Sequence, residues 1–352
     1  MSPEAPNLAA PARDSTRHTA LVVIALLVLG ALAWALHSRV HIGWQPLLQQ
    51  FSAVSWLRVA IGIALIYLCF VLRAARWSVL LAPMRKASTW QLLPAQIIGF
   101  TGVAIFGRVA DLARPYMIAR STDTPVTTQI AIYSMERAFD LAAAATLFSL
   151  ALAFAPRSTP HHHTFVRAGA LSLGLTLALA VVAVVIRLAG GQLARFTERL
   201  LHPLLPRLAD KAAARVLDLQ HGFGAISSFT EFAAAMSLSL LMWAGIAGCY
   251  LMGATAFRAT PQLATFSLSA TMLVMATGMG GSVVQLPVLG WFTQIALFAA
   301  TLHALFHVPL QTATACATLI FSMTNLSVIP GGLLVAHLQQ TSLRGLAKLK
   351  VT

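Results

Sequence analysis

Long apolar stretches separated by short polar segments are the feature that most restricts the fold of this chain. Eight of these stretches are long enough to cross the roughly 30 Å hydrocarbon core of a bilayer as helices. Hydrophobic residues make up 58% of the chain and charged residues only 10%, a balance that no water-soluble globular surface tolerates. Because a segment in lipid must satisfy its own backbone groups, we expect an all-α, polytopic integral membrane protein with about eight transmembrane helices. The predicted spans are 20–36, 56–72, 129–154, 166–186, 233–253, 263–279, 290–306 and 312–334.

A ninth apolar stretch, residues 92–106, is shorter and contains Pro94, Gly99 and Gly102. The positive-inside rule decides whether it crosses, because Lys and Arg concentrate in cytoplasmic loops. If it does not cross, the cytoplasmic segments hold 18 of the 24 basic residues, whereas one more crossing would place the basic loop after residue 186 and the C-terminal tail outside. We therefore predict a re-entrant segment at 92–106, in a chain of the inner membrane with both termini in the cytoplasm.

A second interrupted region, residues 277–287, contains several glycines and ends at Pro287. Two Gly/Pro-broken segments, one in each half, point to the central site of a transporter. Ordinary helix kinks would give the same pattern, so both interpretations stay open, as does the topology of 263–306.

These observations divide the chain into three parts. We predict a cytoplasmic tail at 1–19, a transmembrane domain at 20–338 and a second cytoplasmic tail at 339–352. Within the domain, residues 187–230 form a basic cytoplasmic connection whose Arg and Lys alternate with Leu and Phe, as in helices that lie on an anionic leaflet.

Charged residues are concentrated in two short motifs of this otherwise apolar chain. An ionisable group at membrane depth costs several kcal/mol unless it pairs or lines a wet cavity, which makes such a cluster a candidate functional site. A buried ion-pair network that only fixes helix packing is an equally weighted alternative. The motifs are Arg108-x-x-Asp111-x-x-Arg114 and Glu136-Arg137-x-x-Asp140.

Arginine suits an anionic headgroup because its planar fork of donors matches phosphate oxygens and stays protonated at any relevant pH. Arg108 and Arg114 are the leading candidates, but they are six residues apart and can reach one ligand only if their segment is broken or wraps a cavity. Arg73 and Arg76 share a helical face and could capture headgroups, although positive-inside anchoring is the favoured explanation for that pair.

The two carboxylates of the second motif predict that arginines lie nearby. Glu136 and Asp140 are four residues apart on one helical face, where they repel unless cations intervene. Arg137 is placed to reach Asp140, and Arg114 or Arg108 is a candidate partner for Glu136. In a working transporter, substrate phosphate or a proton would compete for these arginines.

Other functional classes find little support in the sequence. The net charge of +14 is spread over short loops, which suits an anionic membrane surface rather than nucleic acid. The three cysteines lie in apolar stretches without metal-binding spacing, so we expect no metal site and no disulfide. Because nucleotide and hydrolase motifs are missing from the sequence, we expect no cofactor and no enzymatic activity.

Four motifs in this order and spacing resemble the lysylphosphatidylglycerol synthase transmembrane-region family, which includes YbhN-like, AglD-like and hopanoid-associated membrane proteins. The resemblance covers residues 55–335 and departs from the usual pattern at Ala110 and Asp111, where members have Gly-Glu. Here Gly290 also lacks the glutamate that usually follows. The matching motifs are Arg73-x-x-Arg76-Trp77, Arg108-x-x-Asp111-x-x-Arg114, Glu136-Arg137-x-x-Asp140 and Leu286-Pro287 followed by Gly290.

The resemblance implies a flippase-like protein that moves an anionic phospholipid or an isoprenoid-linked lipid between leaflets. Its partners would be membrane lipids and enzymes of envelope-lipid biosynthesis, and the 352 residues contain no aminoacyl-transferase domain, so we expect no self-contained synthase activity. Two alternatives remain at this point, an intramembrane enzyme that acts on a lipid phosphate and a non-catalytic scaffold. The implied substrate-binding residues are Arg73, Arg76, Arg108, Asp111, Arg114, Glu136, Arg137 and Asp140.

Overall fold

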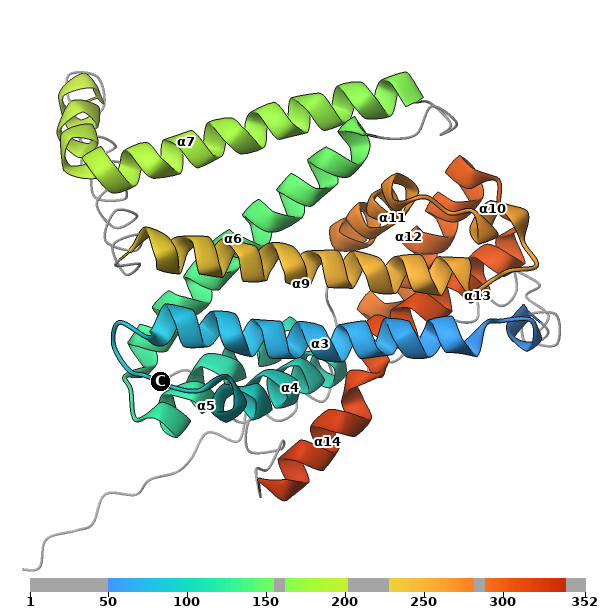
Figure 1. The fold of residues 1–352 in the computed structure, drawn as a ribbon, viewed down its shortest axis with the longest axis horizontal. Coiled ribbons are helices and arrows are strands. Elements are labelled where there is room, and N and C mark those ends of the chain that lie inside the picture. The colour runs from blue at the N-terminus through green and yellow to red at the C-terminus, as the bar shows by residue number, and fades with distance from the viewer. Residues whose placement is uncertain (1–49, 155–161, 202–227, 282–288, 340–352) are drawn as a thin grey trace, which may run out of the picture. The chain divides into compact units, whose positions relative to one another are not determined.

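The computed structural model describes residues 50–154, 162–201, 228–281 and 289–339, so the predicted first span and both tails lie outside the described residues. Residues from Gln50 onward form one compact unit. Apart from an isolated β-bridge between Val54 and Phe257, the regular elements described are helical (Figure 1). They are α3 (Trp56–Leu81), α4 (Thr89–Phe106), η1 (Arg108–Leu112), α5 (Ala113–Thr122), α6 (Val126–Ala153), α7 (His162–Leu201), α9 (Phe229–Thr255), α10 (Pro261–Ala264), α11 (Leu268–Gly281), α12 (Leu289–Phe306), α13 (Leu310–Phe321), η2 (Ser322–Leu326) and α14 (Val328–Leu338).

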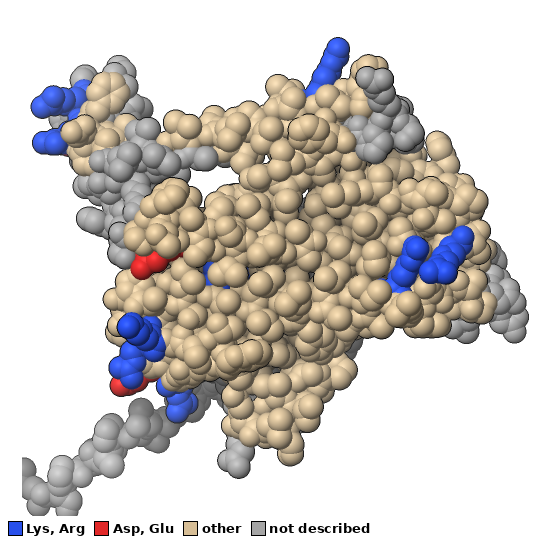
Figure 2. Space-filling view, viewed as in Figure 1, with Lys and Arg blue, Asp and Glu red and all other residues tan. Residues whose placement is uncertain are grey.

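Helix length and hydropathy confirm the prediction of an all-α, polytopic membrane protein. Among the described residues, four segments are long and apolar enough to cross a membrane: α3, α4, α9 and the 29-residue run Leu310–Leu338. The 26 residues of α3 extend over about 39 Å, more than the hydrocarbon thickness. The 28-residue helix α6 is equally long but carries charge, and the 40-residue helix α7 bends at Ala189. In Figure 2 the Lys and Arg side chains lie near helix ends, and the surface between them is almost free of charge.

Helices α3 and α9 run side by side in opposite directions (Figure 1). Cys69 Sγ donates a hydrogen bond to the Met242 carbonyl oxygen at 3.3 Å. Glycines allow this close packing: a Cβ on Gly245 would lie 2.8 Å from Cys69 Sγ, and one on Gly62 would lie 3.4 Å from Met252 Cβ. Small residues at such contacts are typical of helix pairs in membranes, where close van der Waals packing drives association.

A first helical hairpin consists of α4, η1 and α5. The Ser88 side chain caps α4 by accepting from the Gln91 backbone N–H, and Gly107, at φ 77°, ends α4 in a conformation that favours glycine. The chain then turns back, so that Gln91 Nε2 donates to the Ser121 carbonyl oxygen at 3.0 Å. Both ends of the hairpin therefore lie next to each other, which is the arrangement that a re-entrant segment at 92–106 requires.

A second hairpin consists of α11 and α12. The rings of Phe266 and Phe306 are 5.0 Å apart at its open end, and Thr301 Oγ1 donates to Thr277 Oγ1 at 3.1 Å between its arms. These two arms correspond to the predicted spans 263–279 and 290–306, and the residues that join them lie outside the described part of the chain.

The described elements of the two halves follow a similar order. Each has a long helix, a short-armed hairpin and a further long segment, with α3 and α9 as the antiparallel first members. Inverted repeats with broken helices are characteristic of secondary transporters. The first Gly/Pro-broken stretch forms α4 of the first hairpin, and the second begins in α11 and continues outside the described residues.

The C-terminal helical run Leu310–Leu338 is interrupted where it packs against the first half of the molecule. A π-helical turn, η2, interrupts it, and two hydroxyl groups bond the carbonyl oxygens next to the break. Tyr67 donates to Ser327 O at 2.9 Å, and Thr101 Oγ1 lies 3.2 Å from Val328 O. The C-terminal half thereby contacts both α3 and the first hairpin.

Candidate functional site: a buried network of arginines and carboxylates

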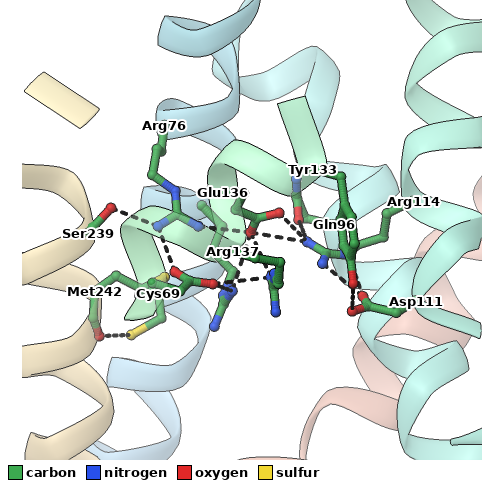
Figure 3. A network of polar contacts seen from close by, with 12 residues as sticks. Cys69, Arg76, Gln96, Asp111, Arg114, Tyr133, Glu136, Arg137, Ser239 and Met242 are labelled. Atoms are coloured by element: carbon green, nitrogen blue, oxygen red, sulfur yellow. Dashed lines mark hydrogen bonds and ion pairs between the residues drawn. The ribbon is translucent and has the colours of Figure 1, made fainter. Parts of the chain in front are cut away.

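The structure brings seven of the eight predicted site residues into one network (Figure 3). The arginines come from α3, α5 and α6, and the carboxylates from η1 and α6. The eighth residue, Arg108, lies in η1 next to the network, and its side chain is outside the described part of the structure. On α3, Arg76 and Arg73 are five and eight residues before the helix end at Leu81, which corresponds to about 8 and 12 Å.

Glu136 is the centre of the network. Its carboxylate lies 2.8 Å from Arg76 Nη2, 3.2 Å from Arg114 Nη1, 3.2 Å from Arg137 Nη2 and 3.5 Å from Arg73 Nη1. The side chain is only 1% exposed. One carboxylate thus ties α6 to α3 and to the returning arm of the first hairpin.

Asp140, one helical turn after Glu136, forms the second group of contacts. Arg76 Nη1 donates to its Oδ1 at 2.7 Å and also to Ser239 Oγ at 2.7 Å, which connects α9 to the network. Arg137 Nη2 lies 3.1 Å from Asp140 Oδ2, and Arg73 Nη1 lies 3.8 Å from the same oxygen. The predicted pairing of Arg137 with Asp140 is therefore present.

Arg114 is completely buried and held by three elements. Its Nε and Nη2 lie 2.9 and 2.8 Å from Asp111 Oδ1, and its Nη1 donates to Gln96 Oε1 at 2.9 Å as well as to Glu136. The missing side chain of Gly99 makes room for it, because a Cβ there would lie 2.0 Å from Arg114 Cγ. This position on α4 can therefore hold only glycine without moving the arginine.

Aromatic rings cover the guanidinium groups. The Phe100 ring lies 4.5 Å from the guanidinium carbon of Arg73 and 4.5 Å from that of Arg114, which is cation–π distance. The Tyr133 ring lies 5.1 Å from the guanidinium of Arg137, and its hydroxyl donates to Asp111 Oδ2 at 2.6 Å. These rings stabilise positive charge where water is scarce.

The described side chains of the network do not balance in charge. Four arginines face three carboxylates, which leaves one excess positive charge. Arg76 and Arg114 are at most 1% exposed and Arg73 is 11% exposed, whereas the Arg137 side chain is 41% exposed. A ligand can therefore reach Arg137 more readily than the other described arginines.

The burial of Arg76 corrects one interpretation. Positive-inside anchoring predicts that Arg73 and Arg76 extend to the membrane surface, but both side chains point into the network instead. The structure also adds residues that the sequence did not single out, namely Gln96, Phe100, Tyr133 and Ser239. Of these four residues, Gln96 is the one that the sequence could have indicated, because it is an amide within the broken apolar stretch 92–106.

Within the part of the chain that the structure describes, no group of three or more His, Cys, Asp or Glu side chains is placed to hold a metal ion. The network itself combines carboxylates with a larger number of guanidinium groups, which repel cations. Its chemistry suits an anion, because arginine forks donate charge-assisted hydrogen bonds to phosphate or carboxylate oxygens.

Comparison with known proteins gives a family but no characterised relative. Neither a curated protein nor a solved structure matches the chain. The family model described as the lysylphosphatidylglycerol synthase TM region matches residues 20–337, which is most of the chain and includes every helix of the network. This match confirms the resemblance seen in the motifs, and it connects the chain to lipid-related processes. The chain therefore belongs to the lysylphosphatidylglycerol synthase transmembrane-region family of integral membrane proteins.

Proposed function

We propose that this protein is a lipid translocase, which moves an anionic phospholipid or an isoprenoid-linked lipid across the inner membrane. The observation that carries the proposal is the buried network with one excess positive charge, beside a re-entrant hairpin. Membership of a lipid-related membrane family supports it. Both termini would lie in the cytoplasm, and envelope-lipid enzymes would be the partners that supply or consume the lipid.

The network can favour an anion without trapping it. A phosphate in the hydrocarbon region needs its charge matched, and Arg137 has a partly exposed side chain, although its Nε and Nη2 atoms are buried. When the lipid leaves, Glu136 and Asp140 remain within 3.2 Å of Arg137 Nη2 and compensate its charge. Exchange between these carboxylates and a headgroup keeps the buried cations paired throughout a transport cycle.

An intramembrane enzyme receives less support from this geometry. A general acid or base needs a carboxylate that can take up and release a proton. Glu136 contacts four arginines, Asp140 contacts three, and Asp111 is bonded to Arg114 and Tyr133. In this arrangement every one of the three carboxylates is already occupied by cationic or hydroxyl partners.

The test is transbilayer movement of fluorescent lipids in proteoliposomes, with anionic and zwitterionic headgroups compared. We expect the wild-type protein to accelerate anionic lipid, and Arg137→Gln to reduce that rate at equal reconstitution. Arg85→Gln is the matched control, because Arg85 is an exposed arginine outside the network. Rates equal to those of protein-free vesicles for every lipid class would refute the proposal.

A further inference from the structure

Arg137 belongs to an exposed stripe of α6. Ile130, Ser134, Arg137 and Leu141 follow one another at spacings of four, three and four residues, which places them on one helical face. Ile130 is 45% exposed and Leu141 is 69% exposed, and Ser134 is exposed as well. In an integral membrane protein, an exposed apolar face of a long helix lies against lipid. The Arg137 side chain, 41% exposed among the described residues, thus lies between the network and this face.

Helix α7 leaves this stripe uncovered. Its contacts with α6 lie near the far end of that helix, where Ser149 bonds to Ser172 at 2.8 Å and Gly169 packs on Leu152 and Ala153. From there the two helices diverge (Figure 1), which agrees with the exposure of Leu141. A lipid-facing arginine is costly in hydrocarbon, and a lipid phosphate can compensate its charge together with Glu136 and Asp140.

We infer that Arg137 is the phosphate contact for a lipid that approaches laterally along the stripe Ile130–Ser134–Arg137–Leu141, and that this contact selects headgroups with a single negative charge, such as phosphodiesters. The inference rests on the proposed function, which it deepens by naming the access route and the headgroup class. It concerns binding, so it can fail independently of transport.

The selection follows from the surroundings of Arg137. Its Nη2 lies 3.2 Å from Glu136 and 3.1 Å from Asp140, so a headgroup at this guanidinium also lies close to two carboxylates. One phosphate charge matches the excess positive charge of the described network, whereas each further charge is repelled by Glu136 and Asp140. A phosphodiester lipid should therefore bind better than a lipid diphosphate.

The experiment is photolabelling of the purified full chain in phosphatidylcholine vesicles with a photoactivatable phosphatidylglycerol. We expect adducts on residues 130–141, and labelling about tenfold weaker in Arg137→Gln, which is the loss that one charge-assisted hydrogen-bonded contact implies. Ser134→Trp fills the stripe without touching the ion pairs and should also reduce labelling. Arg85→Gln, outside the network, should label like the wild type.

Competition identifies the ligand class. Unlabelled phosphatidylglycerol should compete, while a polyprenyl diphosphate at the same concentration and soluble glycerophosphoglycerol should compete much less. Equal labelling of the wild type and both α6 variants, adducts on other helices, or stronger competition by the diphosphate would overturn the inference. Arg137-dependent labelling without lipid flux would refute the translocase alone, and flux without such labelling would refute the lateral site alone.

Discussion

We expect the negative charge of Glu136 to contribute more to the stability of the first half of the fold than the charge of any other residue. Glu136 is 1% exposed and lies within 3.5 Å of four guanidinium groups. Glu136→Gln keeps the shape but removes the charge, so that Arg76 and Arg114, both almost fully buried, each keep a single carboxylate partner, Asp140 and Asp111. Breaking a buried ion pair in this way costs about 3–5 kcal/mol.

The loss should be visible as a lower unfolding temperature of the purified protein in detergent. At about 2–4 °C per kcal/mol for chains of 150–250 residues, the shift is on the order of 10 °C. Asp123→Asn is the control, because Asp123 is exposed and asparagine tolerates its left-handed φ of 52°. We expect that variant to change stability by less than about 0.5 kcal/mol.

A second substitution tests whether charge balance is the cause. Arg73 has the longest contacts of the four, 3.5 Å to Glu136 and 3.8 Å to Asp140. Glu136→Gln combined with Arg73→Gln restores the excess of one positive charge, so the double variant should be more stable than the sum of the single effects by about 0.5–3 kcal/mol. A Glu136→Gln protein that melts like the Asp123→Asn control, or strictly additive losses, would refute this reasoning.

Two further predictions concern the first hairpin. Gly99→Ala should destabilise the protein by about 1–3 kcal/mol in the same melting assay, since the new Cβ collides with Arg114. The control is Gly174→Ala, which has nothing within 4 Å of the new Cβ and should be neutral or stabilising. Equal effects of the two substitutions would contradict the packing described. Met84 precedes the first hairpin, Ser121 lies near the end of its returning arm, and both residues are exposed. Cysteines at these two positions should react with an impermeant maleimide from the same face of the membrane, and a cysteine at the exposed Arg258 from the opposite face. Opposite labelling of the first two would show that the hairpin crosses.

The sequence predicted helices and two of the ion pairs, Arg137 with Asp140 and Arg114 with Glu136, because each leaves a local signal. Hydrophobic runs report membrane helices directly, and Pro94 and Gly99 together with the charge distribution indicate that 92–106 does not cross. The spacing of Arg137 and Asp140 places them on one face, where the structure shows a 3.1 Å contact. Within the described residues, these are short-range relationships along one helix or between neighbouring ones.

Longer-range relationships could not be predicted in the same way. An apolar run of moderate length looks alike whether it crosses or forms one arm of a hairpin, so the sequence leaves the topology of 263–306 open. An arginine near a helix end has the same pattern whether it extends to the surface or turns inward, as Arg76 does toward Glu136. The contact of Ser239 with Arg76 joins positions 163 residues apart, and nothing in either local sequence indicates it.

The unequal chemistry of the two hairpins constrains how the proposed transport works. The first hairpin contributes Arg114 and Asp111 to the network, whereas the described arms of the second meet through the neutral pair Thr277 and Thr301. Among the described parts of the two hairpins, the first thus offers charge to a headgroup. In the proposed cycle a lipid phosphate binds at this charged hairpin, and Glu136 and Asp140 recapture Arg137 when the phosphate departs.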